Sequence, residues 1–364
     1  MSATEETPPI PETPPGAARE VVLRTEGLTK RYGVRTAVNN LALEVRRGDV
    51  FGLLGPNGSG KTTTLRMLLG LVWPLAGSIS LFGENMASTA SRRAALKRIG
   101  AIVEQPSFYP FLTGPENLHG IATFAGMPDN ATTRARVSAV LEQVGLAERD
   151  KDSYRKYSLG MKQRLGIAAA LLNSPDMMIL DEPTNGLDPA GMVEVRALIG
   201  QLATSGVTVM LASHLLHEVQ QVCTRVAILK EGNLLAQGAV SDLLATSSGV
   251  VIGFADAEQL PRAAGALLQA RDAGAVWLRD VRYVLPEPGA WTPPGGWLLR
   301  VDASGDHSGE INALLAGQGI YAAELRRSEG NLEQYFLALT GATNGMTAPA
   351  SAAAAPAMPQ GGQA

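Results

Sequence analysis

The stretch GPNGSGKTTT, Gly55 to Thr64, follows the apolar run Val50–Leu54 and decides the fold. Gly55, Gly60, Lys61 and Thr62 fit the spacing G-x-x-x-x-G-K-[ST], between a predicted strand and a predicted helix. Glycines let backbone amides turn inward, and the start of the helix presents free N–H groups and a positive dipole to an anion. The stretch predicts a phosphate-binding loop; the alternative is a glycine turn with an exposed lysine.

The chemistry of such a loop needs particular side chains. Lys61 is expected on the β and γ phosphates, Thr62 is expected to give its hydroxyl to Mg²⁺, and Thr63 is expected to bind a further phosphate oxygen. Downstream, MMILDEPTNGLDP is an apolar strand that ends in Asp181 and Glu182. The first carboxylate is placed to reach Mg²⁺ and the second to polarise an attacking water. The alternative is a solvated acidic pair before a proline turn.

Short apolar runs alternate with longer amphipathic stretches between residues 49 and 239, which predicts a parallel sheet covered by helices. The expected strands are DVFGLLG, GAIVEQ, DMMILDEP, TVMLASH and RVAILKEG. The preceding segment, residues 21–49, alternates apolar and polar residues and predicts antiparallel strands at one edge. Residues 91–173 are mainly helical in pattern, which predicts an inserted helical subdomain. We therefore expect an α/β phosphate-loop core over residues 21–239.

The remaining segments differ in texture. Residues 1–20 are acidic and rich in proline, and residues 342–364 are of low complexity, so a disordered leader and a disordered tail are expected. Residues 240–341 read as a small C-terminal α+β domain without a catalytic constellation. The absence of about 18 consecutive apolar residues predicts a chain that does not cross a membrane.

Charge and cysteine content limit the partners and the compartment. The 364 residues carry 31 basic and 34 acidic side chains and a net charge of -3, so no nucleic acid is expected as a partner. The single cysteine, Cys223, lies in an apolar segment and is expected in the core of a protein from a reducing cytosol. His214 and His217 could share a metal on a helix, but no third ligand lies near them in the sequence.

With these motifs in place, residues 22–238 resemble the ATP-binding subunits of ABC transporters. The resemblance assigns the Walker A loop, the Walker B aspartate, the catalytic glutamate, the D-loop aspartate, the switch histidine, the Q-loop glutamine and the aromatic residue that stacks on adenine. In this chain these are Gly55, Pro56, Asn57, Gly58, Ser59, Gly60, Lys61, Thr62 and Thr63, then Asp181, Glu182, Asp188, His214, Gln105 and Tyr32. It implies ATP and Mg²⁺ as cofactors, with Gln105 linking the metal and water to the helical subdomain. Tyr32 as a plain packed aromatic remains the alternative.

The signature motif departs from the family pattern, because LSGGQ is replaced by YSLGM, Tyr157 to Met161. Ser158 and Gly160 are retained at a helix start, where they are expected to meet a partner's γ phosphate. YSLGMKQRL resembles the variant of bacitracin-resistance and lantibiotic-immunity ATPases, and Asn331 to Gly341 resembles the end of drug-export, ABC-2-type subunits. One copy of each motif implies a second ATP-binding subunit, a further copy of this chain, in a head-to-tail dimer.

Two classes of function follow from the resemblance. In the first, the chain is an ATPase that drives a separate integral membrane permease from the cytoplasmic face of the cell membrane, exporting a peptide antibiotic or a lipophilic drug. In the second, it is a soluble ABC ATPase that acts on ribosomes or DNA. The chain has one ATP-binding domain, no heptad run and no basic excess, which favours transport. Cargo, direction of transport and the role of the C-terminal domain stay open.

Overall fold

The computed structural model describes residues 19–104, 106–247, 249–284, 297–303, 307–328 and 330–340. The chain divides into two compact units, called unit 1 (Met1–Leu244 with Asn331–Glu333) and unit 2 (Ala245–Gly330 with Gln334–Ala364). Most of the predicted leader and all of the predicted tail lie outside the described residues.

Unit 1 is built on a six-stranded sheet in the order β10-β9-β3-β8-β7-β6. Its strands are β3 (Val50–Leu54), β6 (Ile99–Ile102), β7 (Met177–Asp181), β8 (Thr208–Ser213), β9 (Arg225–Lys230) and β10 (Asn233–Ala239). All neighbouring strands are parallel except β9 and β10, which form a hairpin. The five predicted strands are thus confirmed as the parallel part, and β10 is an addition that the sequence did not predict.

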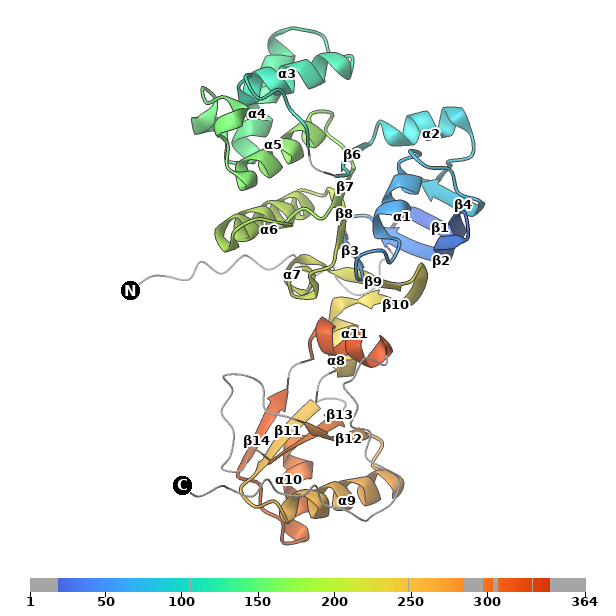
Figure 1. The fold of residues 1–364 in the computed structure, drawn as a ribbon, viewed down its shortest axis with the longest axis vertical. Coiled ribbons are helices and arrows are strands. Elements are labelled where there is room, and N and C mark those ends of the chain that lie inside the picture. The colour runs from blue at the N-terminus through green and yellow to red at the C-terminus, as the bar shows by residue number, and fades with distance from the viewer. Residues whose placement is uncertain are drawn as a thin grey trace, which may run out of the picture. The chain divides into compact units, whose positions relative to one another are not determined.

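Helices cover both faces of this sheet (Figure 1). Helix α1 (Lys61–Leu68) contacts β7 and β8, whereas α6 (Pro189–Thr204) and α7 (Leu216–Val222) contact β3. Every residue of β3, β7 and β8 is buried, which is why these strands read as continuous apolar runs. The carboxyl ends of β3, β7 and β8 lead into the phosphate-loop segment, Glu182 and His214.

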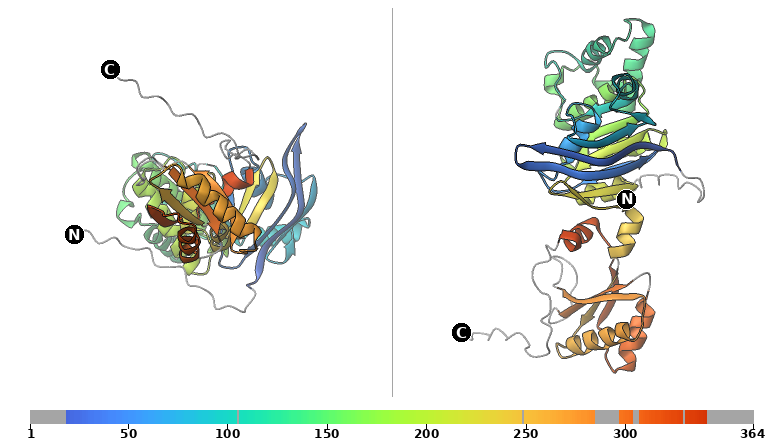
Figure 2. Two further views of the ribbon diagram at one scale, coloured as in Figure 1. Left: turned by 90° about the horizontal axis from the view of Figure 1, so that it is seen from below. Right: turned by 90° about the vertical axis from the view of Figure 1, so that its right-hand side faces the viewer.

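A second sheet of unit 1 is antiparallel, in the order β2-β1-β4-β5. It contains β1 (Val21–Tyr32), β2 (Arg35–Arg46), β4 (Ala76–Leu81) and β5 (Glu84–Asn85), and Figure 2 shows the long curve of β1 and β2. The antiparallel strands predicted from residues 21–49 are confirmed, but they form a sheet of their own. Helix α1 lies between the two sheets, and Leu65 and Leu68 join their common apolar core.

The segment between β6 and β7 is helical. It contains α3 (Gly114–Phe124), α4 (Ala131–Gln143) and α5 (Leu159–Leu171), while α2 (Thr89–Leu96) precedes β6 and contacts β5. Thr113 caps α3 through a reciprocal pair of hydrogen bonds with Glu116. Apolar residues such as Leu118, Leu141 and Leu165 are buried in this helical group.

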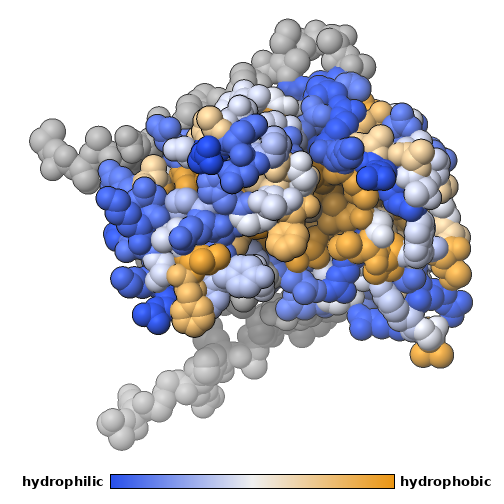
Figure 3. Space-filling model, turned by 90° about the horizontal axis from the view of Figure 1, so that it is seen from above, coloured by the Kyte–Doolittle hydropathy of each residue, from blue (hydrophilic) through white to orange (hydrophobic). Residues whose placement is uncertain are grey.

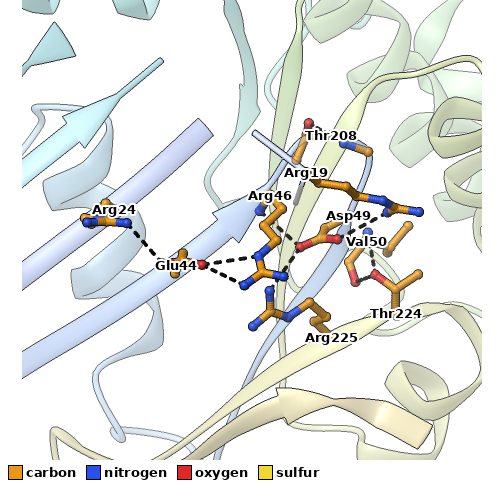
Figure 4. A network of polar contacts seen from close by, with 10 residues as sticks. Arg19, Arg24, Glu44, Arg46, Asp49, Val50, Thr208, Thr224 and Arg225 are labelled. Atoms are coloured by element: carbon orange, nitrogen blue, oxygen red, sulfur yellow. Dashed lines mark hydrogen bonds and ion pairs between the residues drawn. The ribbon is translucent and has the colours of Figure 1, made fainter. Parts of the chain in front are cut away.

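A buried carboxylate makes polar contacts at the amino end of β3, opposite the end that leads into the phosphate loop (Figure 4). Asp49, directly before β3, accepts a hydrogen bond from the backbone N–H of Arg46 at 3.0 Å and lies 3.5 Å from Arg19 Nη1 and 4.0 Å from Arg225 Nη1. Burial raises the pKa of Asp49, and the hydrogen bond and the arginines offset part of that rise. The contacts connect β2, β3 and β9.

Unit 2 has the element order β-α-β-β-α-β: β11 (Gly249–Phe254), α9 (Gln259–Asp272), β12 (Leu278–Val284), β13 (Trp297–Ala303), α10 (Ser308–Gly317) and β14 (Glu324–Ser328). The strand order β12-β13-β11-β14, with antiparallel pairs throughout, is the ferredoxin-like arrangement. Val250, Ile252 and Phe254 pack with residues of α9 and α10 in its core. The predicted combination of a phosphate-loop core, antiparallel β part, helical part and C-terminal α+β unit is confirmed. Two further helices of the described residues are α8 (Val240–Ser247) and α11 (Leu332–Thr340).

Candidate active site

The predicted phosphate loop lies between β3 and α1, and two of its glycines occupy positions that exclude a side chain. Gly55 has φ +153°, and a Cβ there would lie 2.2 Å from the carbonyl oxygen of Leu229. Gly60 has φ +104°, and its Cβ would lie 2.4 Å from the carbonyl oxygen of Ala37. The close approach of β9 and β2 therefore requires glycine at both positions, which gives the loop its tight course.

Lys61 brings a positive charge into this loop. Its side chain is only 6% exposed, and Nζ donates hydrogen bonds to the carbonyl oxygens of Gly55 at 2.8 Å and Pro56 at 3.3 Å. The same nitrogen lies 3.5 Å from Oε1 of Glu182. The neighbouring Ser59 hydroxyl is buried without a hydrogen-bond partner. A helix start, an ammonium group and an unsatisfied hydroxyl together suit a bound anion.

Asp181 ends β7 beside Thr62. Its Oδ1 is buried and has no hydrogen-bond partner. Burial raises the pKa of Asp181, and a hydrogen bond with the Thr62 side chain partly counteracts this rise. In the described residues no group of three His, Cys, Asp or Glu side chains could hold a metal ion. One carboxylate and one hydroxyl fit Mg²⁺, which commonly takes few protein ligands and completes its shell with substrate phosphates and water.

Glu182 and His214 meet although 32 residues separate them in the sequence. Because β7 and β8 are neighbours, His214 Nδ1 lies 2.8 Å from Oε2 of Glu182. Glu182 has φ +49°, an unusual value for a residue with a side chain, and its N–H donates to the carbonyl oxygen of Ala212 at 2.9 Å. Such strain occurs mainly where the surrounding structure fixes it, often at functional sites. The Glu182 carboxylate thus bridges Lys61 and His214.

The signature and D-loop residues lie at two neighbouring helix starts. Ser158 caps α5 by accepting a hydrogen bond from the N–H of Met161 at 3.2 Å, and Asp188 caps α6 by accepting one from Gly191 at 3.1 Å. A Cβ on Gly160 would lie 3.8 Å from the Cα of Gly191. Of the hydrogen bonds and ion pairs between described residues, none joins Ser158 or Asp188 to the phosphate loop. Within one chain, these predicted site residues form a second group.

The remaining predicted residues are more scattered. Tyr32 ends β1 with 48% of its surface exposed, and Lys30 Nζ lies 5.4 Å from its ring centre. Gln105 lies outside the described residues. His217 contacts Gln221 at 2.8 Å. Sequence reasoning missed Arg35, whose guanidinium donates to the carbonyl oxygen of Gly58 at 3.0 Å; the available signal was a cation three positions after Tyr32.

Comparisons with known proteins find relatives over most of the chain. A family model described as ABC transporter matches residues 38–185. The bacitracin transport ATP-binding protein BcrA of Bacillus licheniformis is 40% identical over 321 residues, which is 88% of this chain and 97% of that protein. The lantibiotic transport ATP-binding protein SrtF of Streptococcus pyogenes is 39% identical and covers 59% of this chain and 90% of its own length.

Solved structures show the same fold. The dimeric structure of MJ0796, a bacterial ABC transporter cassette, has a TM-score of 0.55 and 25% sequence identity, and the match covers 60% of this chain and 98% of that one. No helix among the described residues is both long and apolar enough to cross a membrane. The chain belongs to the family of ABC transporter ATP-binding subunits, ATPases whose nucleotide hydrolysis is coupled to transport.

Proposed function

We propose that the phosphate loop, Asp181, Glu182 and His214 form one half of an ATP-hydrolysing site. The observation that carries the proposal is the position of Glu182, between Lys61 at 3.5 Å and His214 at 2.8 Å. Lys61 binds the β and γ phosphates, together with loop amides from Gly55 to Thr63. Glu182 orients the attacking water and takes its proton, and the hydrogen bond from His214 fixes the carboxylate. Tyr32 stacks on adenine.

The fit of Asp181 and Thr62 supports a magnesium site at the end of β7. Asp181 Oδ1 lacks a protein partner, and Thr62 is its neighbour. Mg²⁺ bound there would neutralise charge on the phosphates. Gln105 is proposed as a further ligand from its position in the sequence.

The second half of the site is proposed to come from another copy of this chain. Ser158, Gly160 and Asp188 form a group apart from the phosphate loop, as two head-to-tail chains require. The α5 helix start offers amides to the γ phosphate across the interface. A similar cassette has been solved as a dimer. ATP held between two chains would stabilise the closed dimer, and hydrolysis would release it.

A separate integral membrane permease is the proposed partner at the cytoplasmic face of the membrane. Figure 3 shows apolar side chains gathered on the face seen from above, with hydrophilic ones around them. In the loop before α3, Tyr109 and Phe111 are 65% and 79% exposed. We propose that this segment, residues 108–118, docks the permease. The names of the relatives BcrA and SrtF support bacitracin-like or lantibiotic-like peptides as cargo.

Copurification tests this function. A tagged Glu182→Gln chain would be purified from detergent-solubilised membranes with ATP and Mg²⁺, and its companions identified by mass spectrometry. A stoichiometric protein with several membrane spans is expected. Recovery of the chain with ribosomes or DNA in the soluble fraction would contradict the transport function and leave the ATP site in place. Lys61→Ala serves as the control that should lack nucleotide-dependent complexes.

A further inference from the structure

Arg35 lies at the edge of the phosphate loop. It is the first residue of β2 and pairs with Tyr32, the last residue of β1, across the turn Gly33–Val34. Its guanidinium reaches over the loop and donates from Nη2 to the carbonyl oxygen of Gly58 at 3.0 Å. A Cβ on Gly58 would lie 2.9 Å from that same nitrogen, so the absence of a side chain at Gly58 leaves room for the contact.

The charge of Arg35 is not matched by an acidic neighbour. Among the ion pairs of the described residues none includes Arg35, and its hydrogen bond to Gly58 uses a single donor to an uncharged carbonyl oxygen. A guanidinium has five N–H donors in a planar fork, and the hydrogen bond to Gly58 uses one of them. The residue is exposed and accessible to a ligand. Phosphate oxygens are the acceptors that such a fork binds best.

Lys61, the cation inside the loop, has different neighbours from Arg35. Lys61 is buried and pairs with Glu182, near the carboxyl ends of β7 and β8. Arg35 instead neighbours Tyr32, the proposed adenine contact. In a nucleotide whose base lies on Tyr32 and whose terminal phosphate lies at Lys61, the α and β phosphates come between these two ends, and Arg35 contacts the loop at Gly58.

We propose that Arg35 is a nucleotide-binding residue that holds the α or β phosphate of ATP, an assignment that rests on the proposed phosphate site. The contact is the same in ATP and ADP, and it does not change during hydrolysis. The contact therefore strengthens the binding of both ATP and ADP, and it leaves the rate of the chemical step unaltered.

Binding of ATP, ADP and adenosine to the full-length chain tests the assignment. Arg35→Ala is expected to weaken ATP and ADP about tenfold each, or about 1.4 kcal/mol, and to leave adenosine binding unchanged. The KM for ATP should rise in parallel while kcat stays the same. Arg35→Lys keeps the charge and should recover part of the affinity. Equal loss for adenosine, or no loss for ATP, would overturn the proposal.

Two further variants distinguish a direct contact between Arg35 and phosphate from a purely structural role, in which Arg35 only stabilises the loop. Arg35→Gln keeps an N–H donor, two bonds nearer the backbone, but has no charge, so it should bind ATP as weakly as Arg35→Ala; affinity restored by glutamine would mean that the charge of Arg35 does not act on the phosphates. Arg31→Ala removes the same charge from an exposed position of β1 and should bind ATP normally. If Lys61→Ala also bound ATP normally, the phosphate site itself would be wrong, which is a different outcome.

Discussion

A partly buried ion pair between α6 and α7 offers a quantitative test of how the site is supported. Arg196 Nη1 lies 3.2 Å from Oε1 of Glu218, and the two side chains are 20% and 15% exposed. Arg196 also donates to Gln221, while Oε2 of Glu218 is buried without a partner. Helix α6 starts after Asp188 and α7 follows His214, so the pair joins the two helices that leave the site.

Replacing the arginine alone should lower the free energy of unfolding more than replacing both members of the pair. Arg196→Met leaves a largely buried carboxylate unpaired and is expected to destabilise unit 1 by about 3 kcal/mol, at the lower end for broken buried pairs because both groups keep some solvent contact. Glu218→Gln leaves Arg196 its contact with Gln221 and should cost about 1.5 kcal/mol. The double variant should cost about 2 kcal/mol, which gives a coupling of about 2.5 kcal/mol.

Cys223 makes the measurement specific for unit 1. It is the single cysteine of the chain, it follows α7, and burial raises the pKa of its thiol. Because the thiolate is the reactive form, pulse labelling across a urea gradient reports the unfolding of this unit alone. Arg134→Met, which breaks the exposed pair with Asp129, is the control and should cost at most about 1 kcal/mol. A coupling near zero for Arg196 and Glu218 would refute the reasoning.

Three other outcomes are expected. Gly60→Ala should abolish ATP binding, because the added Cβ would displace the loop from β2. Gly120→Ala, at an exposed position of α3 with open space around the added Cβ, should bind ATP normally. Equal binding by both variants, measured by fluorescence titration, would contradict the loop geometry. Burial raises the pKa of Asp49, so between its unfolded and its native pKa the native state binds more protons than the unfolded chain, and stability falls as pH rises through that range. Urea unfolding of wild type and Asp49→Asn from pH 4 to 7 should show the wild type losing stability relative to the variant as pH rises; a constant difference would contradict this. Cys223 should react with a thiol reagent in the native protein far more slowly than in urea, and equal rates would contradict its burial.

The local motifs of the site could be predicted because each is written in consecutive residues. Continuous apolar runs predicted β3, β7 and β8, whose residues are all buried in the structure, and the glycine spacing predicted the loop between β3 and α1. The role of Glu182 was expected from its place after an apolar strand, and the role of His214 from resemblance to the family. Their 2.8 Å contact required the order of β7 and β8 in the sheet, which the local pattern does not contain.

Long-range pairing explains what the sequence did not predict. The antiparallel strands of residues 21–49 form their own sheet because β1 pairs with β4, where Leu23 faces Leu81 across more than fifty residues. The contact between Arg35 and Gly58 depends on the position of the β1–β2 turn above the loop, which no local motif encodes. In unit 2, composition predicted an α+β unit, while the strand order depends on pairings between distant segments.

The association of Glu182→Gln chains with ATP tests the central claim most directly. The full-length variant and the double variant with Lys61→Ala would be compared by size-exclusion chromatography with light scattering, in ATP and Mg²⁺, with bound nucleotide quantified in each peak. The account predicts a dimer of Glu182→Gln that contains two ATP molecules and a nucleotide-free monomer of the double variant. A Glu182→Gln chain that binds ATP but remains a monomer would contradict the claim that two copies complete each site.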